Sequence, residues 1–260
     1  TFEEYGQRYS EENMVVYWPD NEDFRYTAED LTDFFGDKGI RNLILINPDN
    51  PSGNYLSKAE LLKLAAWTEE NQMTLLIDES FVDFAEEQEA TMIQQHILDR
   101  YRHLFVMKSI SKSYGVPGLR LGVLASGDTD RIAKLKKDVA IWNINSFAEF
   151  YLQIEEKYAK EYLAALDQFR EERACFVNEL TRILGLRVIP TQANYVMAEV
   201  VTGMTAMELN RRLLVRHHIL IKNLTGKIRH EGRQYIRLAI RTKEENNRLI
   251  KALREELQAV

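Results

Sequence analysis

Short apolar runs alternate with longer amphipathic stretches through the first half of the chain, and this alternation restricts the possible fold more than any other feature. Such runs are typical of strands in a parallel sheet, whose successive strands are joined by crossovers that are usually helices. The stretch 57–71 reads as such a helix, because Ser57 and Glu60 form a capping box ahead of an apolar side. The sequence predicts strands at 14–17, 42–46, 74–77, 104–107 and 121–125, and a further helix at 128–139.

The second half of the chain has a different rhythm. The stretch 146–183 contains neither Gly nor Pro and predicts a long helix. Short strands then mix with two helices, which indicates a smaller α+β domain, and we place the domain boundary near residue 160, giving domains 1–160 and 161–260. The fold class is therefore α/β, a mainly parallel sheet with flanking helices, plus the smaller α+β domain. Its predicted strands cover 187–189, 195–199, 220–222 and 235–240, and its helices cover 205–217 and 243–257.

Composition and charge argue against several classes of protein. Lys and Arg number 34 against 40 Asp and Glu, so the net charge is -6 and gives no basic surface for nucleic acid. The single cysteine, Cys175, permits no intramolecular disulfide and no Cys-rich metal site, and indicates a reducing cytoplasm. No apolar run approaches membrane-spanning length, and the first residues lack the features of a signal peptide. We expect a cytoplasmic protein that binds no metal, membrane or nucleic acid.

One loop carries the strongest chemical signal. Residues 109–122 read Ser-Ile-Ser-Lys-Ser-Tyr-Gly-Val-Pro-Gly-Leu-Arg-Leu-Gly. The amine of Lys112 can form an imine, and the hydroxyls of Ser109 and Ser111 with the charge of Arg120 can hold a phosphate beside it. An imine-forming lysine and a phosphate site on one loop suggest pyridoxal phosphate. Taken singly, each residue is also ordinary surface or turn chemistry.

Two upstream segments suit the same cofactor. The turn Asn47-Pro48-Asp49-Asn50-Pro51-Ser52-Gly53 follows one apolar run, Asp78 ends the next, and Lys112 follows a third. The carboxyl ends of parallel strands meet at one edge of a sheet, where open α/β sheets bind ligands. Independent turns have no reason to reproduce the contacts of one cofactor in this order.

These motifs resemble the aspartate aminotransferase superfamily, the fold-type-I pyridoxal phosphate enzymes of aminotransferase classes I and II, nearly from end to end. Within it the chain looks most like the branch that contains histidinol-phosphate aminotransferase and threonine-phosphate decarboxylase. The segments that carry this resemblance are 78–84, 142–146, 193–195 and 235–241. The resemblance implies a transferase-like large domain, pyridoxal 5'-phosphate as the cofactor and a homodimer.

The resemblance also implies roles for the cofactor-binding residues. Asp78 would pair with the protonated pyridine nitrogen, Asn50 would donate to the ring oxygen, and Lys112 would be the Schiff-base lysine and the catalytic base. Phe81 stands where many aminotransferases carry a tyrosine, and such a phenylalanine also occurs in decarboxylase-like members. Phe2 lies where relatives have an aromatic ring that stacks on the pyridine.

For the substrate, the resemblance points to the second half of the chain. Arg237 resembles the arginine that grips the α-carboxylate, and Asn194 resembles a residue near it. The loop 142–146 resembles one near the cofactor. Arg241 shares a face of the strand with Arg237 and either covers the surface or assists with an anionic substrate. Glu79 should point away from Asp78 and reads as a solvated or structural carboxylate.

The start of the chain resembles a segment found well inside family members. We therefore expect a fragment that lacks an amino-terminal arm, a substrate-contacting tyrosine and a Gly-containing phosphate-binding turn, and that binds the cofactor more weakly than a complete chain. The leading interpretation is an aminotransferase acting on an amino acid or an amino-acid-like, including a phosphorylated, substrate. One alternative is a decarboxylase of the threonine-phosphate type, and another is a catalytically inert domain of a larger polypeptide.

Overall fold

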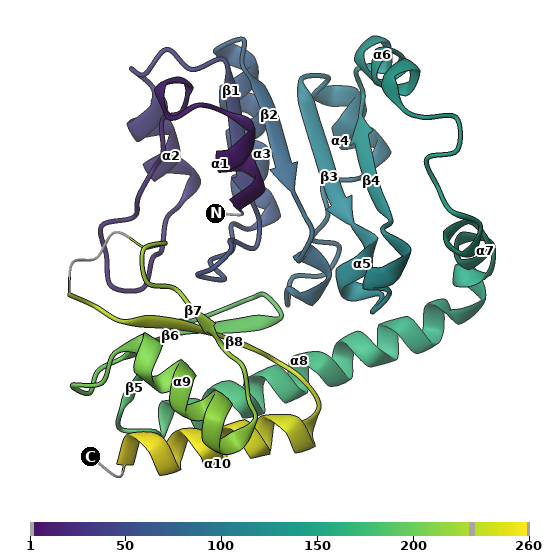
Figure 1. Ribbon diagram of the computed structural model, residues 1–260. Helices are drawn as coiled ribbons and strands as arrows, with labels where there is room; N and C mark the ends of the chain where they lie inside the picture. The colour runs from purple at the N-terminus through teal and green to yellow at the C-terminus, as the bar shows by residue number, and fades with distance from the viewer. Residues whose placement is uncertain (1–2, 229–231, 259–260) are drawn as a thin grey trace. The chain divides into compact units, whose positions relative to one another are not determined.

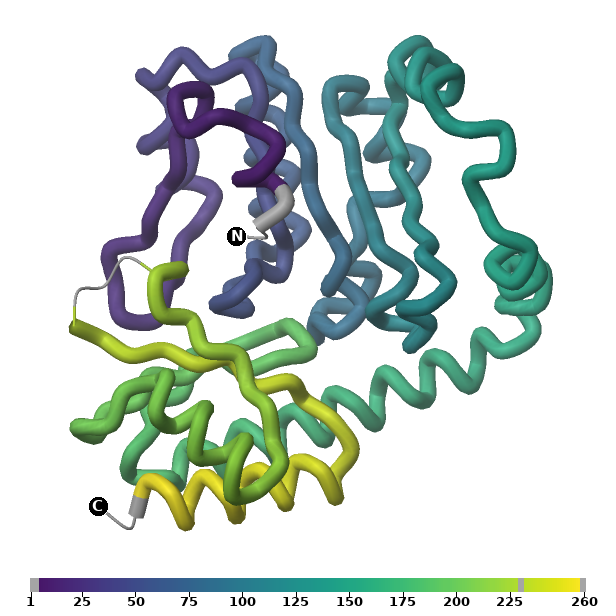
Figure 2. Tube along the Cα trace, viewed as in Figure 1, coloured from purple at the N-terminus to yellow at the C-terminus, as the bar shows by residue number. Residues whose placement is uncertain are grey.

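The computed structural model describes residues 3–228 and 232–258, and it divides into two compact units (Figures 1 and 2). The first unit comprises Thr1–Tyr17, Tyr26–Asn50 and Tyr55–Asp167. The second comprises Gln168–Val260 with two short earlier segments, Trp18–Arg25 and Pro51–Asn54. The division into domains 1–160 and 161–260 stays a prediction.

The first unit is built on a four-stranded sheet in the order β1-β2-β3-β4 (Figure 1). The first three strands run parallel and the fourth pairs antiparallel with β3. Leu75, Ile77 and Leu104 are fully buried, as expected of a sheet covered on both faces. The mainly parallel α/β fold predicted from the sequence is thereby confirmed. The strands are β1 (Asn42–Ile46), β2 (Thr74–Asp78), β3 (Leu104–Ser109) and β4 (Gly122–Ser126).

The predicted strand at 14–17 is wrong. These residues have no regular secondary structure. Instead, the ring of Tyr17 packs edge-on against Tyr26 and Phe34, with ring centroids 6.0 Å and 5.1 Å away. Tyr17 therefore serves side-chain packing rather than a backbone ladder, while Val15 and Val16 are exposed.

Helices connect and cover these strands. The capping box predicted at Ser57 is present, since Ser57 Oγ accepts from the Glu60 N–H and the Glu60 carboxylate accepts from the Ser57 N–H. Thr27 and Asp30 form a second capping box, which begins a helix that the sequence analysis missed. The helices are α1 (Glu3–Arg8), α2 (Ala28–Phe35), α3 (Lys58–Glu70), α4 (Gln95–Arg100), α5 (Ile110–Ser113) and α6 (Thr129–Asp138).

The single long helix predicted over 146–183 is divided into α7 (Ser146–Ile154), the 3-10 turn η4 (Glu155–Tyr158) and α8 (Ala159–Thr181). The ring of Tyr162 in α8 stacks on Tyr114, with centroids 4.1 Å apart and planes 8° from parallel. This stack attaches the beginning of α8 to the residue that follows α5.

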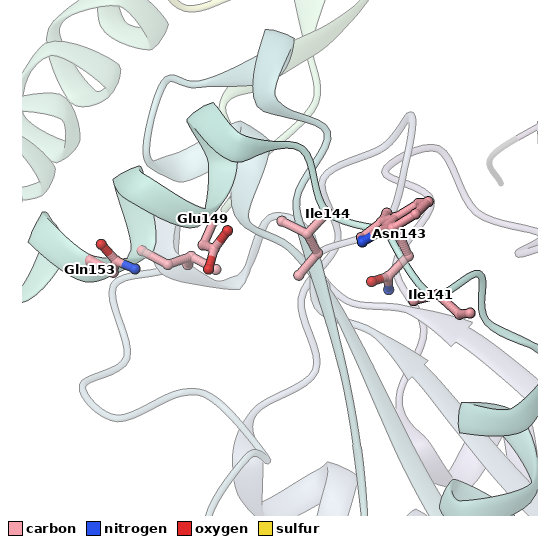
Figure 3. Close-up of a pocket in the computed structure, with 7 residues that line it drawn as sticks. Ile141, Asn143, Ile144, Glu149 and Gln153 are labelled. Atoms are coloured by element: carbon pink, nitrogen blue, oxygen red, sulfur yellow. The ribbon is translucent and has the colours of Figure 1, made fainter.

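An exposed apolar segment lies between α6 and α7. Ile141 and Trp142 are each 92% exposed, and Phe147 and Phe150 at the start of α7 are also exposed. A hollow of about 490 Å³ lies along this segment and is lined by Ile141, Trp142, Asn143, Ile144, Glu149, Leu152 and Gln153 (Figure 3). Contiguous exposed apolar surface of this kind is typical of interaction sites.

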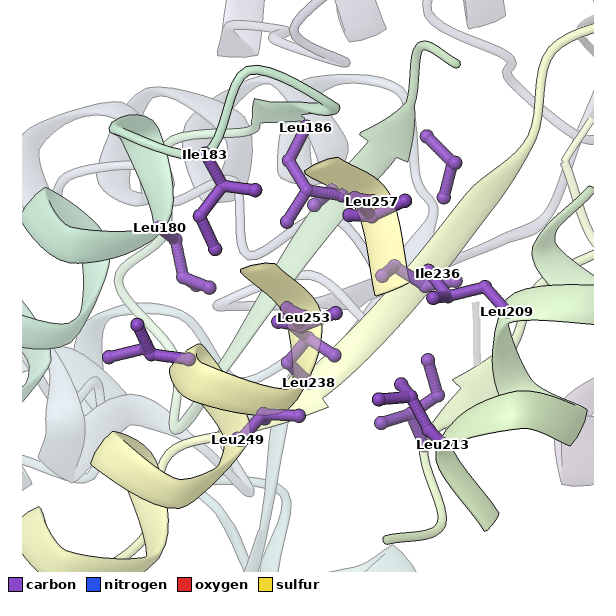
Figure 4. Close-up of a cluster of buried hydrophobic side chains, with 14 of the residues drawn as sticks. Leu180, Ile183, Leu186, Leu209, Leu213, Ile236, Leu238, Leu249, Leu253 and Leu257 are labelled. Carbon is purple, nitrogen blue, oxygen red and sulfur yellow. The ribbon is translucent and has the colours of Figure 1, made fainter. Parts of the chain in front are cut away.

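The second unit contains a four-stranded antiparallel sheet in the order β5-β6-β8-β7. Its core fills the space between sheet and helices, and Figure 4 shows Leu253 of the last helix beside Leu238 of the sheet. Leu249, Leu253 and Leu257 are buried at helical spacing on one side of that helix. The elements are β5 (Leu186–Val188), β6 (Tyr195–Val200), α9 (Ala206–His217), β7 (Lys222–Asn223), β8 (Tyr235–Ala239) and α10 (Lys243–Gln258).

Candidate active site

The carboxyl ends of β1, β2 and β3 lie level with one another. Ile46 is paired with Asp78, and Asp78 is paired with Met107. Backbone hydrogen bonds continue past the strand ends, because the Asn47 N–H donates to the Asp78 carbonyl and the Glu79 N–H donates to the Met107 carbonyl. The segments that follow the three strands are therefore held together at one edge of the sheet, as the sequence analysis expected.

The turn after β1 is fixed by the side chain of Asn47. Its amide donates to the Leu56 carbonyl at 2.9 Å and its carbonyl accepts from the Leu56 N–H at 2.8 Å. Both residues are buried, so water cannot reach the N–H and carbonyl of Leu56. The Asn47 side chain supplies the hydrogen bonds that these two backbone groups need. The turn leads to the half-buried Asn50.

Asp78 is buried, and both of its carboxylate oxygens accept hydrogen bonds. Ser80 donates to one oxygen from its hydroxyl at 2.5 Å and from its N–H at 3.0 Å. The hydroxyl of Tyr5 in α1 donates to the other at 2.8 Å. Three donors thus hold this carboxylate in place, and a carboxylate is the group that would pair with a protonated pyridine nitrogen.

Tyr5 is a site residue that the sequence analysis missed. Burial, followed by the charge of Asp78, raises the pKa of the Tyr5 hydroxyl well above its ordinary value. The hydroxyl therefore remains a donor across the whole physiological range. Since 73 residues separate the two side chains, no local pattern in the sequence indicates their contact.

Lys112 lies on the short helix α5, directly after β3, and its side chain is exposed. Its Nζ is 6.0 Å from the centroid of the Phe81 ring, so the predicted Schiff-base lysine and Phe81 are neighbours. Ser109 precedes α5, and its N–H donates to Ser80 Oγ at 3.3 Å. Thus Lys112, Phe81 and Ser109 belong to the same edge of the sheet as Asp78.

The other two residues predicted to hold phosphate differ in exposure. Ser111 is buried and its hydroxyl lies 3.4 Å from the Leu121 carbonyl. Arg120 is exposed, has a left-handed backbone (φ 57°) and donates to the Pro117 carbonyl at 3.2 Å. The Ile110 N–H donates to the Leu121 carbonyl, which joins the start of α5 to the residue after Arg120. The phosphate-binding roles of Ser111 and Arg120 stay predictions.

Glu79, one residue after Asp78, is fully buried rather than solvated. Its carboxylate accepts from the Thr91 hydroxyl at 2.6 Å and from the Met92 N–H at 2.7 Å. Burial, partly offset by these hydrogen bonds, raises the pKa of Glu79 to about 7. Of the two alternatives given above, the structural one describes this carboxylate.

The predicted substrate residues both lie in the second unit. Arg237 is on β8, and its guanidinium carbon is 4.9 Å from the centroid of the Tyr195 ring. Asn194 directly precedes β6, and its carbonyl accepts from the Ile240 N–H at 3.1 Å. Arg241 forms an exposed ion pair with Glu245 at 2.7 Å, in agreement with the surface alternative.

The loop 142–146 meets the Arg120 region through Asn145. The Asn145 amide donates to the Leu119 carbonyl at 3.1 Å, and its side-chain oxygen caps α7 by accepting from the Ala148 N–H. Phe2 lies outside the described residues. Within residues 3–228 and 232–258, no group of three or more His, Cys, Asp and Glu side chains is arranged to hold a metal ion. No helix in the described part of the chain has the length and apolar character needed to cross a membrane.

The side chains at this edge fit pyridoxal 5'-phosphate by their chemistry. Lys112 offers an exposed primary amine, Asp78 offers a carboxylate held in place by hydrogen bonds, and Ser109 and Arg120 offer a hydroxyl and a fixed positive charge. These are the groups that an aldehyde, a pyridine nitrogen and a phosphate require.

Comparisons with known proteins agree. The model of the family "Aminotransferase class I and II" matches residues 8–253. The chain is 36% identical to L-serine phosphate decarboxylase of Sulfurospirillum multivorans, over 99% of this chain and 67% of that protein. It is 35% identical to CMP-5'-(3-aminopropyl)phosphonate synthase of Streptomyces rubellomurinus, over 98% of this chain but only 40% of the synthase.

Solved structures give the same result. A decarboxylase from Sulfurospirillum multivorans matches with a TM-score of 0.84 and 34% identity, covering 94% of this chain and 70% of that one. The histidinol-phosphate aminotransferase from Clostridium acetobutylicum matches with a TM-score of 0.83 and 26% identity, covering 95% and 72%. Threonine-phosphate decarboxylase of Salmonella typhimurium is 30% identical over 84% of this chain and 58% of its own length. The chain therefore belongs to the pyridoxal-phosphate-dependent aminotransferase class I and II family, in the branch that includes histidinol-phosphate aminotransferase and threonine-phosphate decarboxylase.

Proposed function

We propose that this chain acts in a pyridoxal-phosphate-dependent decarboxylation of a phosphorylated amino acid, with L-serine phosphate as the first candidate substrate. The observation that carries the proposal is the 36% identity to L-serine phosphate decarboxylase along almost the whole chain. Phe81 supports it, since such a phenylalanine also occurs in decarboxylase-like members of the family and, unlike tyrosine, offers the ring oxygen no second donor beside Asn50. This replaces the aminotransferase as the leading interpretation and makes the earlier alternative the main one.

Each residue of the site has a defined task in this proposal. The bound cofactor supplies a conjugated ring that accepts the electron pair left on the substrate α-carbon. Lys112 holds the cofactor and afterwards carries a proton at its Nζ, while Asp78 keeps the proton on the pyridine nitrogen. Arg237 binds an acidic group of the substrate, and Asn194 orients the same group.

Aminotransfer remains the second candidate, supported by the similarity to histidinol-phosphate aminotransferase. The two reactions differ in their products. Decarboxylation of L-serine phosphate releases carbon dioxide and leaves ethanolamine phosphate, whereas aminotransfer requires a keto acid and converts it into an amino acid.

The test uses the full chain loaded with pyridoxal phosphate and given L-serine phosphate, with and without 2-oxoglutarate. We expect carbon dioxide and ethanolamine phosphate in equal amounts, independent of 2-oxoglutarate, and no product from Lys112→Ala. Formation of glutamate that depends on 2-oxoglutarate would favour aminotransfer. Absence of any cofactor absorbance band in the loaded protein would favour the catalytically inert domain.

We also propose a homodimer and a cytoplasmic location. The dimer is supported by the exposed apolar segment that includes Ile141, Trp142 and Phe147. The location rests on the single cysteine, Cys175.

A further inference from the structure

Asp83 bridges the two ends of the segment that carries Lys112. It lies in the 3-10 turn η2 (Val82–Phe84), five positions beyond Asp78. Its Oδ1 accepts from Lys108 Nζ at 2.5 Å, and its Oδ2 accepts from Ser113 Oγ at 2.5 Å. Lys108 directly precedes Ser109, and Ser113 directly follows Lys112, so one carboxylate holds both flanks of the segment 109–112.

The geometry points to a role for Asp83 as a positioning residue that determines which lysine attaches the cofactor. By pairing with Lys108, it holds that amine as a charged, hydrogen-bonded group, and by binding Ser113 it fixes the helix that presents Lys112. The inference rests on the proposed attachment at Lys112. Attachment forms one C=N bond and releases one water, and requires no oxidant or reductant.

The ion pair has the burial needed for this role. The side chains of Lys108 and Asp83 are only 17% and 16% exposed, so water screens their attraction less than it screens a surface pair. A charge-assisted hydrogen bond of this kind is stronger than a neutral one. An amine attacks an aldehyde through a free electron pair, so Lys108 Nζ would have to leave Asp83 and give up a proton before it could react.

Neighbouring groups close the cluster on its other sides. Glu79 faces it from the position directly after β2, since, besides the larger effects of burial and of its own hydrogen bonds, the charge of Lys108 lowers and that of Asp83 raises the pKa of Glu79. Tyr162 faces it from α8, because the charge of Asp83, after burial, raises the pKa of that phenol. Tyr114, on which Tyr162 stacks, directly follows Ser113 in the sequence. The cluster thus connects the segment after β2 with β3, α5 and the beginning of α8 within the first unit.

Two lysines therefore lie within five residues of each other at the same strand end, and only their environments distinguish them. Lys108 is half-buried and ion-paired, whereas Lys112 is exposed above the Phe81 ring. If Asp83 is replaced by an uncharged residue, the amine of Lys108 is released and competes with that of Lys112 for the cofactor.

The experiment maps the lysine that retains the cofactor after borohydride reduction of the loaded full chain. In the parent chain we expect the reduced cofactor on Lys112 alone. In Asp83→Asn we expect it on both Lys108 and Lys112, with a cofactor dissociation constant about tenfold higher. In the double variant Asp83→Asn, Lys108→Met, labelling should return to Lys112 alone, because the competing amine is absent.

A second pair of variants separates positioning from folding. Ser113→Ala removes one ligand of Asp83 and should weaken cofactor binding, whereas Ser113→Thr retains the hydroxyl and should restore it. Label on Lys112 alone in Asp83→Asn, with parental cofactor affinity, would overturn the inference even if that variant melts at a lower temperature. Absence of label on Lys112 in the parent chain would instead overturn the attachment site itself, and with it this inference.

Discussion

Asp78 receives three hydrogen bonds from groups of its own chain, two of them from Ser80 and one from Tyr5. The local donors follow from the turn after β2, since Ser80 lies only two residues away. The donor from Tyr5 comes from a separate helix and ties the position of α1 to the charge at the strand end. At the scale of the residue, the site is thus preorganised around one carboxylate.

Tyr5→Phe removes the donor to Asp78 and leaves the ring in place. We expect the free energy of unfolding to fall by about 1–2 kcal/mol, because a buried carboxylate loses a hydrogen bond. We also expect weaker binding of pyridoxal phosphate, measured by absorbance titration. Tyr9→Phe is the matched control, since Tyr9 is exposed. Equal stability and cofactor affinity in the two variants would show that the Tyr5 hydroxyl has no role.

Glu79→Gln should make the protein less sensitive to pH. Because the folded-state pKa of about 7 lies above the ordinary value of 4.5, Glu79 favours the folded state at low pH. That contribution is lost as the pH rises from 4.5 to 7. Glutamine resembles the protonated acid, accepting from the Met92 N–H and donating to Thr91. The free energy of unfolding of Glu79→Gln minus that of the parent should rise by about 2–3 kcal/mol between pH 5 and pH 8, measured by urea denaturation. A constant difference would contradict the raised pKa.

At the scale of the element, sequence patterns predict what is encoded locally. Ser57 and Glu60 predict a helix over 57–71, and the structure has α3 with Ser57 as its N-cap and Asn71 as its C-cap. Thr27 and Asp30 form the same kind of capping box at the start of α2, a helix absent from the sequence prediction. The strand at 14–17 was wrong because an apolar run does not reveal whether a partner strand exists. The break at Glu155–Tyr158 contains no Gly or Pro that would mark it.

The candidate site was predictable to the same extent. Lys112, Asp78 and Ser109 each follow or end an apolar run, so their common location at the sheet edge follows from strand order. The contacts of Tyr5 and Asp83 join segments far apart in the sequence, and nothing local to either residue specifies the partner.

Gly53 is required by the conformation of its loop. Its φ is +78°, and a Cβ there would lie 2.0 Å from Thr191 Oγ1. Thr191 in turn binds the Tyr195 carbonyl and the Ala193 N–H, so the turn around Asn194 would shift. We expect Gly53→Ala to lower the free energy of unfolding by about 2–5 kcal/mol, the sum of left-handed strain and overpacking.

Gly39→Ala is the matched control for that substitution, because Gly39 has a φ of +60° and no atom within 4 Å of a built Cβ. It should show the left-handed strain alone, about 1–2 kcal/mol. Urea denaturation of both variants gives the comparison. If Gly53→Ala lowers the free energy of unfolding no more than Gly39→Ala does, then Thr191 moves away from the new Cβ without any loss of stability.

At the scale of the whole molecule, the predicted residues are divided between the two units. The residues assigned to the cofactor, apart from Phe2, lie in the first unit, and Arg237 and Asn194 lie in the second. A reaction that uses both sets therefore depends on both units. Cofactor binding and substrate binding should be separable by mutation, since each set is anchored in its own sheet.

Removal of apolar side chains from the segment between α6 and α7 should weaken the proposed homodimer. We expect the parent chain to sediment as a dimer, and Trp142→Ser and Phe147→Ser each to raise the dimer dissociation constant at least about tenfold, because a buried aromatic contributes about 1.5–3 kcal/mol. Leu184→Ser is the control, since Leu184 is 89% exposed in the second unit. A monomeric parent chain, or equal effects of all three variants, would reject this interface.

The exposure of Trp142 has an optical consequence. An indole in water emits at longer wavelength than one in an apolar environment, so Trp142 should dominate the red side of the protein's fluorescence. Trp18 and Trp67 are the other two tryptophans, and neither is as exposed. Any molecule that covers the segment would shift the emission to the blue and restrict access of a soluble quencher such as iodide. The chain thus contains its own reporter for whatever binds beside α7.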